Sequence, residues 1–163
     1  MAIKSTTKGN CKVEIDEDRL AAIAGTDMLT KFPLSALRAG AQYWHTGILP
    51  KHFYPSAGSN YRYARRSVKY ESDSRKANKP DLVYSGTLRR DLESKFRVIE
   101  GKKSIKLKMF SNVLNLSGAN RAKYGKMPNL KKEIRAVTKE ERTAVARVVE
   151  TELKAFAKAK FGA

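Results

Sequence analysis

The sequence predicts an α+β fold in which a small, mostly antiparallel sheet packs against two long helices joined by extended loops. Three features predict this fold: a hairpin pattern over residues 95–109, an apolar-striped helix over residues 33–50, and a capped helix that begins after Thr138. A chain of 163 residues is long enough for one compact domain with its own core. We therefore expect a flexible N-terminal arm over residues 1–10 and a single domain over residues 11–163.

Alternation of apolar and polar side chains predicts the strands of the sheet. Residues 12–16 alternate over one short strand, and a longer alternation on both sides of a turn at residues 100–103 predicts a hairpin. Its apolar side carries Phe96, Val98, Ile105, Leu107 and Met109. Its other side carries Lys95, Arg97, Lys106 and Lys108. Two further strands are predicted over residues 112–116 and 130–136, and polar loops over residues 55–60 and 117–128.

The helix over residues 33–50 has apolar side chains on two sides. Pro33 suits its first turn, and Leu49–Pro50 is expected to end it. One stripe consists of Leu34, Leu37, Ala41, Trp44 and Ile48. A second, mostly small stripe consists of Ala36, Gly40, Tyr43 and Gly47. Glycine costs about 1 kcal/mol in a helix relative to alanine, so two glycines indicate close approach of another element, from the same domain or from a neighbouring subunit. The candidate subunit contacts are Gly40, Tyr43, Trp44 and Gly47.

The C-terminal helix carries a start signal and an apolar stripe. Thr138 and Glu141 are spaced as a capping box, in which each side chain bonds the backbone amide of the other residue. The stripe that follows consists of Val145, Val148, Val149, Leu153 and Phe156. Lysines near its end complement the helix dipole. Residues 18–24 predict one or two further helical turns.

Basic residues dominate the second part of the chain. The net charge is +18, of which residues 1–59 contribute only +2, with seven basic and five acidic residues. A polyanion or an acidic protein surface is therefore the expected neighbour.

A helix is also predicted from Tyr61 to about Asn78, and its spacing places four cations on one face. Those four candidate contacts for DNA or an acidic partner are Arg62, Arg65, Arg66 and Lys69. Tyr63 and Tyr70 lie beside them and could stack on bases. The alternative interpretation is a solvated face, and the basic residues of the hairpin favour a sheet edge protected against aggregation.

Residues able to support catalysis are few. Cys11 is the single cysteine, so the chain forms no internal disulfide, which fits a reducing compartment. The two histidines, His45 and His52, lack a third metal ligand at a matching spacing. No phosphate-binding glycine loop or nucleophile elbow is present, and no run is apolar enough to span a membrane. We therefore expect no enzyme, catalytic residue, cofactor or metal.

Three segments in order carry a resemblance to a known family. They are WHTGILPKHF over residues 44–53, YRYARRSVKY over residues 61–70, and PDLVYSGTLR over residues 80–89. The basic hairpin, a long loop containing Met127–Pro128 and the capped helix follow. This order resembles the tail-completion or head–tail joining (neck) proteins of long-tailed bacteriophages, including the virion morphogenesis group, over about residues 30–155. Relatives often have a Pro-Arg-Pro-Phe stretch before the last helix, where this chain has Met127 to Leu130.

The resemblance implies a structural virion protein without catalytic residues. It implies an α+β subunit that forms a homo-oligomeric ring around the DNA channel, with portal, connector or stopper proteins on the head side and tail terminator or tail tube proteins on the other. Genomic DNA would pass through the ring. The protein would be assembled in the bacterial cytoplasm and located in the virion, with no membrane partner.

Two other hypotheses come from the residues alone. The first is a non-specific nucleic-acid-binding protein that uses the basic helix face, which predicts affinity that falls steeply with salt. The second is a metal-dependent enzyme built on His45 and His52, which predicts stoichiometric metal in the purified protein.

Overall fold

The computed structural model describes residues 10–16, 34–64, 86–101, 104–115 and 129–161, with a few single positions between residues 68 and 82. The described elements form an α+β fold, as predicted. The predicted turns over residues 18–24, the loop over residues 117–128 and nearly all of the N-terminal arm lie outside the described residues.

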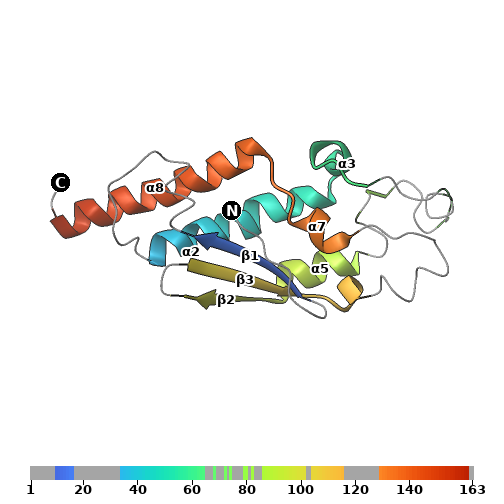
Figure 1. Cartoon of the computed structure of the whole chain (residues 1–163), viewed down its shortest axis with the longest axis horizontal. Helices are drawn as coiled ribbons and strands as arrows, with labels where there is room; N and C mark the ends of the chain where they lie inside the picture. The colour runs from blue at the N-terminus through green and yellow to red at the C-terminus, as the bar shows by residue number, and fades with distance from the viewer. Residues whose placement is uncertain are drawn as a thin grey trace.

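The sheet has three antiparallel strands (Figure 1). They are β1 (Asn10–Asp16), β2 (Phe96–Glu100) and β3 (Ser104–Phe110), in the order β1-β3-β2. The predicted hairpin is confirmed, and Gly101 N donates to Ser104 O (2.7 Å) where the chain turns. The predicted first strand is confirmed too, and it begins at Asn10, which therefore belongs to the sheet and not to the arm.

The helix predicted over residues 33–50 is a continuous helical segment of three kinds of turn. It consists of α2 (Leu34–Tyr43), the π-helical η1 (Trp44–Ile48) and the 3-10 helix η2 (Leu49–Phe53). The predicted end at Leu49–Pro50 is wrong, because Pro50 lies in the first turn of η2, where a missing N–H leaves no intrahelical bond unmade.

The C-terminal helix α8 (Lys139–Phe161) is 23 residues long and lies on the side of α2 opposite the sheet (Figure 1). Its capping box is confirmed: Thr138 N donates to Glu141 Oε2 (3.0 Å) and Glu141 N to Thr138 Oγ1 (3.2 Å). Because α2 is the middle layer between α8 and the sheet, its two apolar sides are covered by its own chain. The helix therefore needs no second subunit to bury them.

The core lies at these two interfaces of α2. Its largest fully buried side chains include Trp44, Leu37, Ile48, Leu107, Met109 and Val149. In the hairpin, β3 buries its apolar residues as predicted, whereas Phe96 and Ile99 of β2 keep 40% and 45% exposure. The burial of the hairpin is therefore one-sided: its central strand belongs to the core and its outer strand lies at the surface.

Short helices replace several predicted strands and loops. The predicted strand over residues 112–116 is wrong, because η3 (Asn112–Asn115) is a 3-10 turn. The strand predicted over residues 130–136 is wrong as well: α7 (Leu130–Ile134) forms there, and the Asn129 side chain accepts from Lys132 N (3.1 Å) as its N-cap.

Two more helices complete the described fold. The predicted loop over residues 55–60 contains α3 (Ala57–Asn60), a single turn. An unpredicted helix, α5 (Thr87–Ser94), precedes the hairpin and follows Gly86, whose φ of 76° favours glycine. None of the helices in the described segments is both long and apolar enough to cross a membrane.

Candidate functional site

Two of the four candidate subunit contacts lie in the interior of the chain itself. Trp44 is fully buried and Gly40 is buried on α2, so neither residue is exposed to a neighbour in the described fold. The prediction that these two residues form a subunit surface is wrong, because both pack within the domain. The sequence pattern left this alternative open, and only the position of α8 decides it.

The other two candidates lie at the edge of the buried side. Tyr43 is 36% exposed, and Gly47 is half-buried. A methyl group added at Gly47 would meet the ring of Tyr43 at an ordinary contact distance of 3.6 Å. The described fold therefore does not require glycine at position 47, and contact of Tyr43 and Gly47 with another subunit stays a prediction.

The two histidines bind different partners inside the chain. His45 Nε2 lies 3.0 Å from Leu92 O, and the His45 ring packs on Phe96 with 4.0 Å between centroids. His52 Nδ1 lies 2.6 Å from the Tyr63 hydroxyl oxygen. Within the described residues, no group of three or more histidine, cysteine, aspartate or glutamate residues is placed to hold a metal ion.

His52 is fully buried in a stack of aromatic rings. Its ring lies parallel to that of Tyr61, 4.0 Å between centroids, and Tyr63 extends the stack. Burial lowers the pKa of His52 to about 4, and the backbone of Ala136 opposes this shift by a smaller amount. His52 is therefore neutral at pH 7, which agrees with a role in packing.

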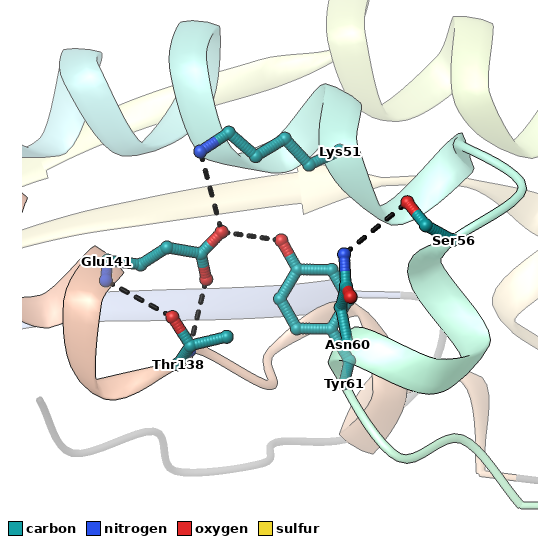
Figure 2. A network of polar contacts seen from close by, with 6 residues as sticks. All are labelled: Lys51, Ser56, Asn60, Tyr61, Thr138 and Glu141. Carbon is teal, nitrogen blue, oxygen red and sulfur yellow. Dashed lines mark hydrogen bonds and ion pairs between the residues drawn. The ribbon is translucent and has the colours of Figure 1, made fainter.

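A buried carboxylate ties the segment after η2 to the start of α8 (Figure 2). Glu141 Oε1 accepts the Tyr61 hydroxyl (2.6 Å) and lies 3.7 Å from Lys51 Nζ, while Oε2 accepts Thr138 N. Burial, together with the neighbouring Glu141 carboxylate, raises the pKa of the Tyr61 phenol. Each polar atom that this junction buries around Glu141 has a partner, so we assign it a structural role.

The predicted cationic helix face is not formed as expected at its N-terminal end. Arg62 has a φ of 53° in the turn that follows α3, so the predicted helix does not begin at Tyr61. Arg62 is exposed, whereas Arg65, Arg66 and Lys69 lie outside the described residues. Tyr63 is half-buried against the core and His52, so its hydroxyl is already bonded. DNA or acidic-partner contact by the four cations stays a prediction.

The hairpin instead presents basic residues on the outer face of the sheet. Arg97 of β2 lies directly opposite Lys108 of β3, and Lys108 is also paired in register with Lys12 of β1. We call Lys108 and Arg97, whose side chains the structure describes, the cationic row. Lys95 does not extend it, because its ammonium pairs with Asp91 of α5 (2.8 Å). The sequence showed the basic residues, but only the strand register shows that Arg97 and Lys108 lie directly opposite each other.

The outer strand of the hairpin is a sheet edge with exposed apolar side chains. No other strand in the described part of the chain pairs with β2 on the side away from β3. Phe96 packs on His45 and Glu100 pairs with Arg38 of α2, so these two residues face the helix layer. Ile99 lies on the opposite face with Arg97, as strand alternation requires. The β2 edge is the second candidate contact surface.

Comparison with known proteins returns no match, neither among protein-family models nor among curated proteins or solved structures. We therefore infer the function of the chain from the motifs in its sequence and from the geometry of the hairpin.

Proposed function

We propose that the chain is a structural subunit of the neck or tail of a long-tailed bacteriophage, and that copies of it form a ring at the head–tail interface. Two lines of reasoning support the proposal. The ordered segments over residues 44–53, 61–70 and 80–89 resemble those of tail-completion and neck proteins. The β2 edge is the observation on which the proposal depends most, because it offers a surface for self-association.

An edge strand exposes backbone N–H and C=O groups that can pair with another chain. Proteins usually protect such edges with charge, and Arg97 and Glu100 give β2 some of that protection. Phe96 and Ile99 weaken this protection, because both are apolar and 40% or more exposed on a strand of five residues. An unpaired edge strand with exposed apolar side chains favours pairing with another chain.

A ring requires contact between two different surfaces of the subunit. The sheet ends in β1 at one edge and β2 at the other, and their sequences differ. Contact of the β2 edge with a different surface of the next copy is heterologous, and such contacts close into a ring when the rotation between copies divides a full turn. Tyr43 and Gly47 are the remaining candidates for the same interface on the helix layer.

In this role the protein acts by shape and carries out no reaction. It would occupy the virion between the portal side and the tail tube, with DNA passing through the ring. The test is electron microscopy of particles produced without the protein. We expect filled heads and separate tails, because the joint is missing. Intact, infectious virions would refute the proposal.

A further inference from the structure

The cationic row places like charges directly opposite each other. Like-charged pairs in neighbouring strands destabilise a sheet. Here Arg97 and Lys108 also share one aromatic ring: the Arg97 guanidinium lies 6.0 Å and the Lys108 ammonium 5.5 Å from the centroid of Phe110. Attraction to the ring holds both cations on the outer face of the sheet. The hairpin thus keeps two positive charges together at the surface.

Five basic side chains of the described segments have acidic partners within the chain. The pairs are Arg38–Glu100, Lys51–Glu141, Arg89–Glu93, Lys95–Asp91 and Lys154–Glu150. Others, such as Arg90, Arg147 and Lys158, make no ion pair with a described residue, but they lie on helices apart from the sheet face. For Arg97 and Lys108, no carboxylate of a described residue lies within ion-pair distance. Arg97 is exposed and Lys108 half-buried, so both remain accessible to an anion from outside.

We propose that the cationic row binds the phosphate backbone of duplex nucleic acid without reading its bases. Adjacent strands are about 4.8 Å apart, so the two backbone positions of the row lie roughly 5 Å apart across the sheet. Phosphate oxygens supply the anions that the row lacks, and contacts of this kind carry no sequence information. The net charge of +18 favours a long polyanion over a local acidic patch, because a duplex offers phosphates along its whole length.

This inference goes beyond assembly, since it assigns a ligand to a face of the sheet that a single copy already presents. It also differs from binding by the predicted helix face, because Arg62, Arg65, Arg66 and Lys69 are not part of the row. Loss of nucleic-acid binding and loss of self-association are therefore separable.

The test measures binding of the full-length chain to a fluorescently labelled duplex of mixed sequence by anisotropy, over a range of salt concentrations. The variant combines Arg97→Gln and Lys108→Gln. Each lost phosphate contact lowers the slope of log affinity against log salt by about 1. Each lost contact also lowers the affinity for the duplex by roughly eightfold at about 0.1 M salt, as the slope of counterion release implies. We expect a slope smaller by about 2 and an affinity lower by roughly 60-fold.

The matched control combines Arg89→Gln and Lys154→Gln, which removes the same amount of charge from ion-paired positions. We expect its slope to equal that of the unmodified chain. Thermal unfolding by circular dichroism checks that both double variants are folded, and we expect the row variant to melt no lower than the unmodified chain.

Three results would overturn the inference. The first is weak binding of the unmodified chain with no salt slope. The second is an equal loss of slope in the control, which would show that only net charge matters. In the third, polyglutamate competes with the labelled duplex as well as unlabelled duplex does at equal charge, and the row variant loses binding to both polyanions. That result would assign the face to an acidic protein.

Discussion

The junction around Glu141 and the outer face of the sheet differ in whether their charged groups have partners of opposite charge within the described part of the chain. At the junction the buried Glu141 carboxylate has three partners, the Tyr61 hydroxyl, the Lys51 ammonium and the Thr138 amide, and the Glu141 backbone amide donates to the Thr138 hydroxyl. On the sheet face, Arg97 and Lys108 lie side by side and share only the ring of Phe110. One region satisfies its polar groups within the chain and the other leaves them for a partner.

The difference separates structural polarity from candidate function. A buried charge is tolerated when every polar atom around it is bonded, and such a site gains nothing from an external ligand. Like charges held together at a surface are destabilising until an opposite charge arrives. The hairpin is therefore the part of the described fold that we expect to contact partners, and the junction is the part we expect to hold the fold together.

The largest effect is expected from Glu141→Ala, which removes the centre of the junction. The change deletes the hydrogen bond from the Tyr61 hydroxyl to the charged carboxylate and leaves that buried hydroxyl without its partner (together about 3 kcal/mol), and it deletes the capping-box bond from Thr138 N to Glu141 Oε2 (about 1 kcal/mol). We expect the free energy of unfolding to fall by about 4 kcal/mol, as measured by urea denaturation.

Glu150→Ala is the control for this change, since it removes a carboxylate that makes only an exposed pair with Lys154 one turn away. We expect no measurable loss of stability. Equal losses in the two variants would show that the junction is not a special structural centre.

The second effect is a pH dependence of folding that originates in His52. The folded chain binds a proton at His52 only below about pH 4, whereas the unfolded chain binds it below about 6.5. Stability from this group is therefore complete above pH 6.5 and is lost as the pH falls toward 4, by about 3 kcal/mol. Tyr61, whose ring is packed against His52, has a raised pKa and stays neutral over this range.

The measurement compares urea denaturation of the unmodified chain and of His52→Phe near pH 7 and near pH 4. Other groups contribute equally to both proteins, so their difference isolates His52. We expect the variant to lose about 3 kcal/mol less than the unmodified chain on acidification. An identical loss in both proteins would contradict a neutral, buried His52.

The smallest effect is expected from Lys108→Thr in the absence of nucleic acid. The change removes the repulsion with Arg97 and introduces threonine, which is favourable in strands. The free energy of unfolding should therefore rise by roughly 0.5 kcal/mol. The gain should shrink with added salt, because salt screens the repulsion. Lys106→Thr on the same strand, which is paired with Ile99, serves as the comparison and should show no such salt-dependent gain. A loss of stability at low salt for Lys108→Thr would show that the row is not repulsive.

Local signals account for what the sequence predicted well. The capping box of Thr138 and Glu141 spans four residues, and the hairpin alternation spans one turn, so neither depends on distant parts of the chain. The failures have local causes too. Leu130 and Ile134 are four positions apart, which is a helical spacing and agrees with α7. Ile134 and Ala136 are two positions apart, and that spacing favoured the wrong prediction of a strand. In α5, Leu88, Asp91 and Leu92 form a helical buried face that the nearby hairpin pattern obscured.

The candidate surfaces were less predictable because they depend on which residues meet in the folded chain. Tyr61 and Glu141 are 80 positions apart, and no spacing in the sequence indicates that they meet. The cationic row requires the register of β2 against β3, which places Arg97 directly opposite Lys108. The interface prediction at Gly40 failed for the same reason, since its helix α2 packs against α8 from the far end of the sequence.

Native mass spectrometry of the full-length chain and of Ile99→Lys tests the central claim, that copies associate through the hairpin side. A lysine at position 99 places a charge in the proposed contact without removing any core residue, because Ile99 is 45% exposed. We expect one closed oligomer for the unmodified chain, with a central hole in averaged particle images, and a monomer for the variant. A monomeric unmodified chain at every concentration, or a variant that assembles as well as the original, would contradict the account.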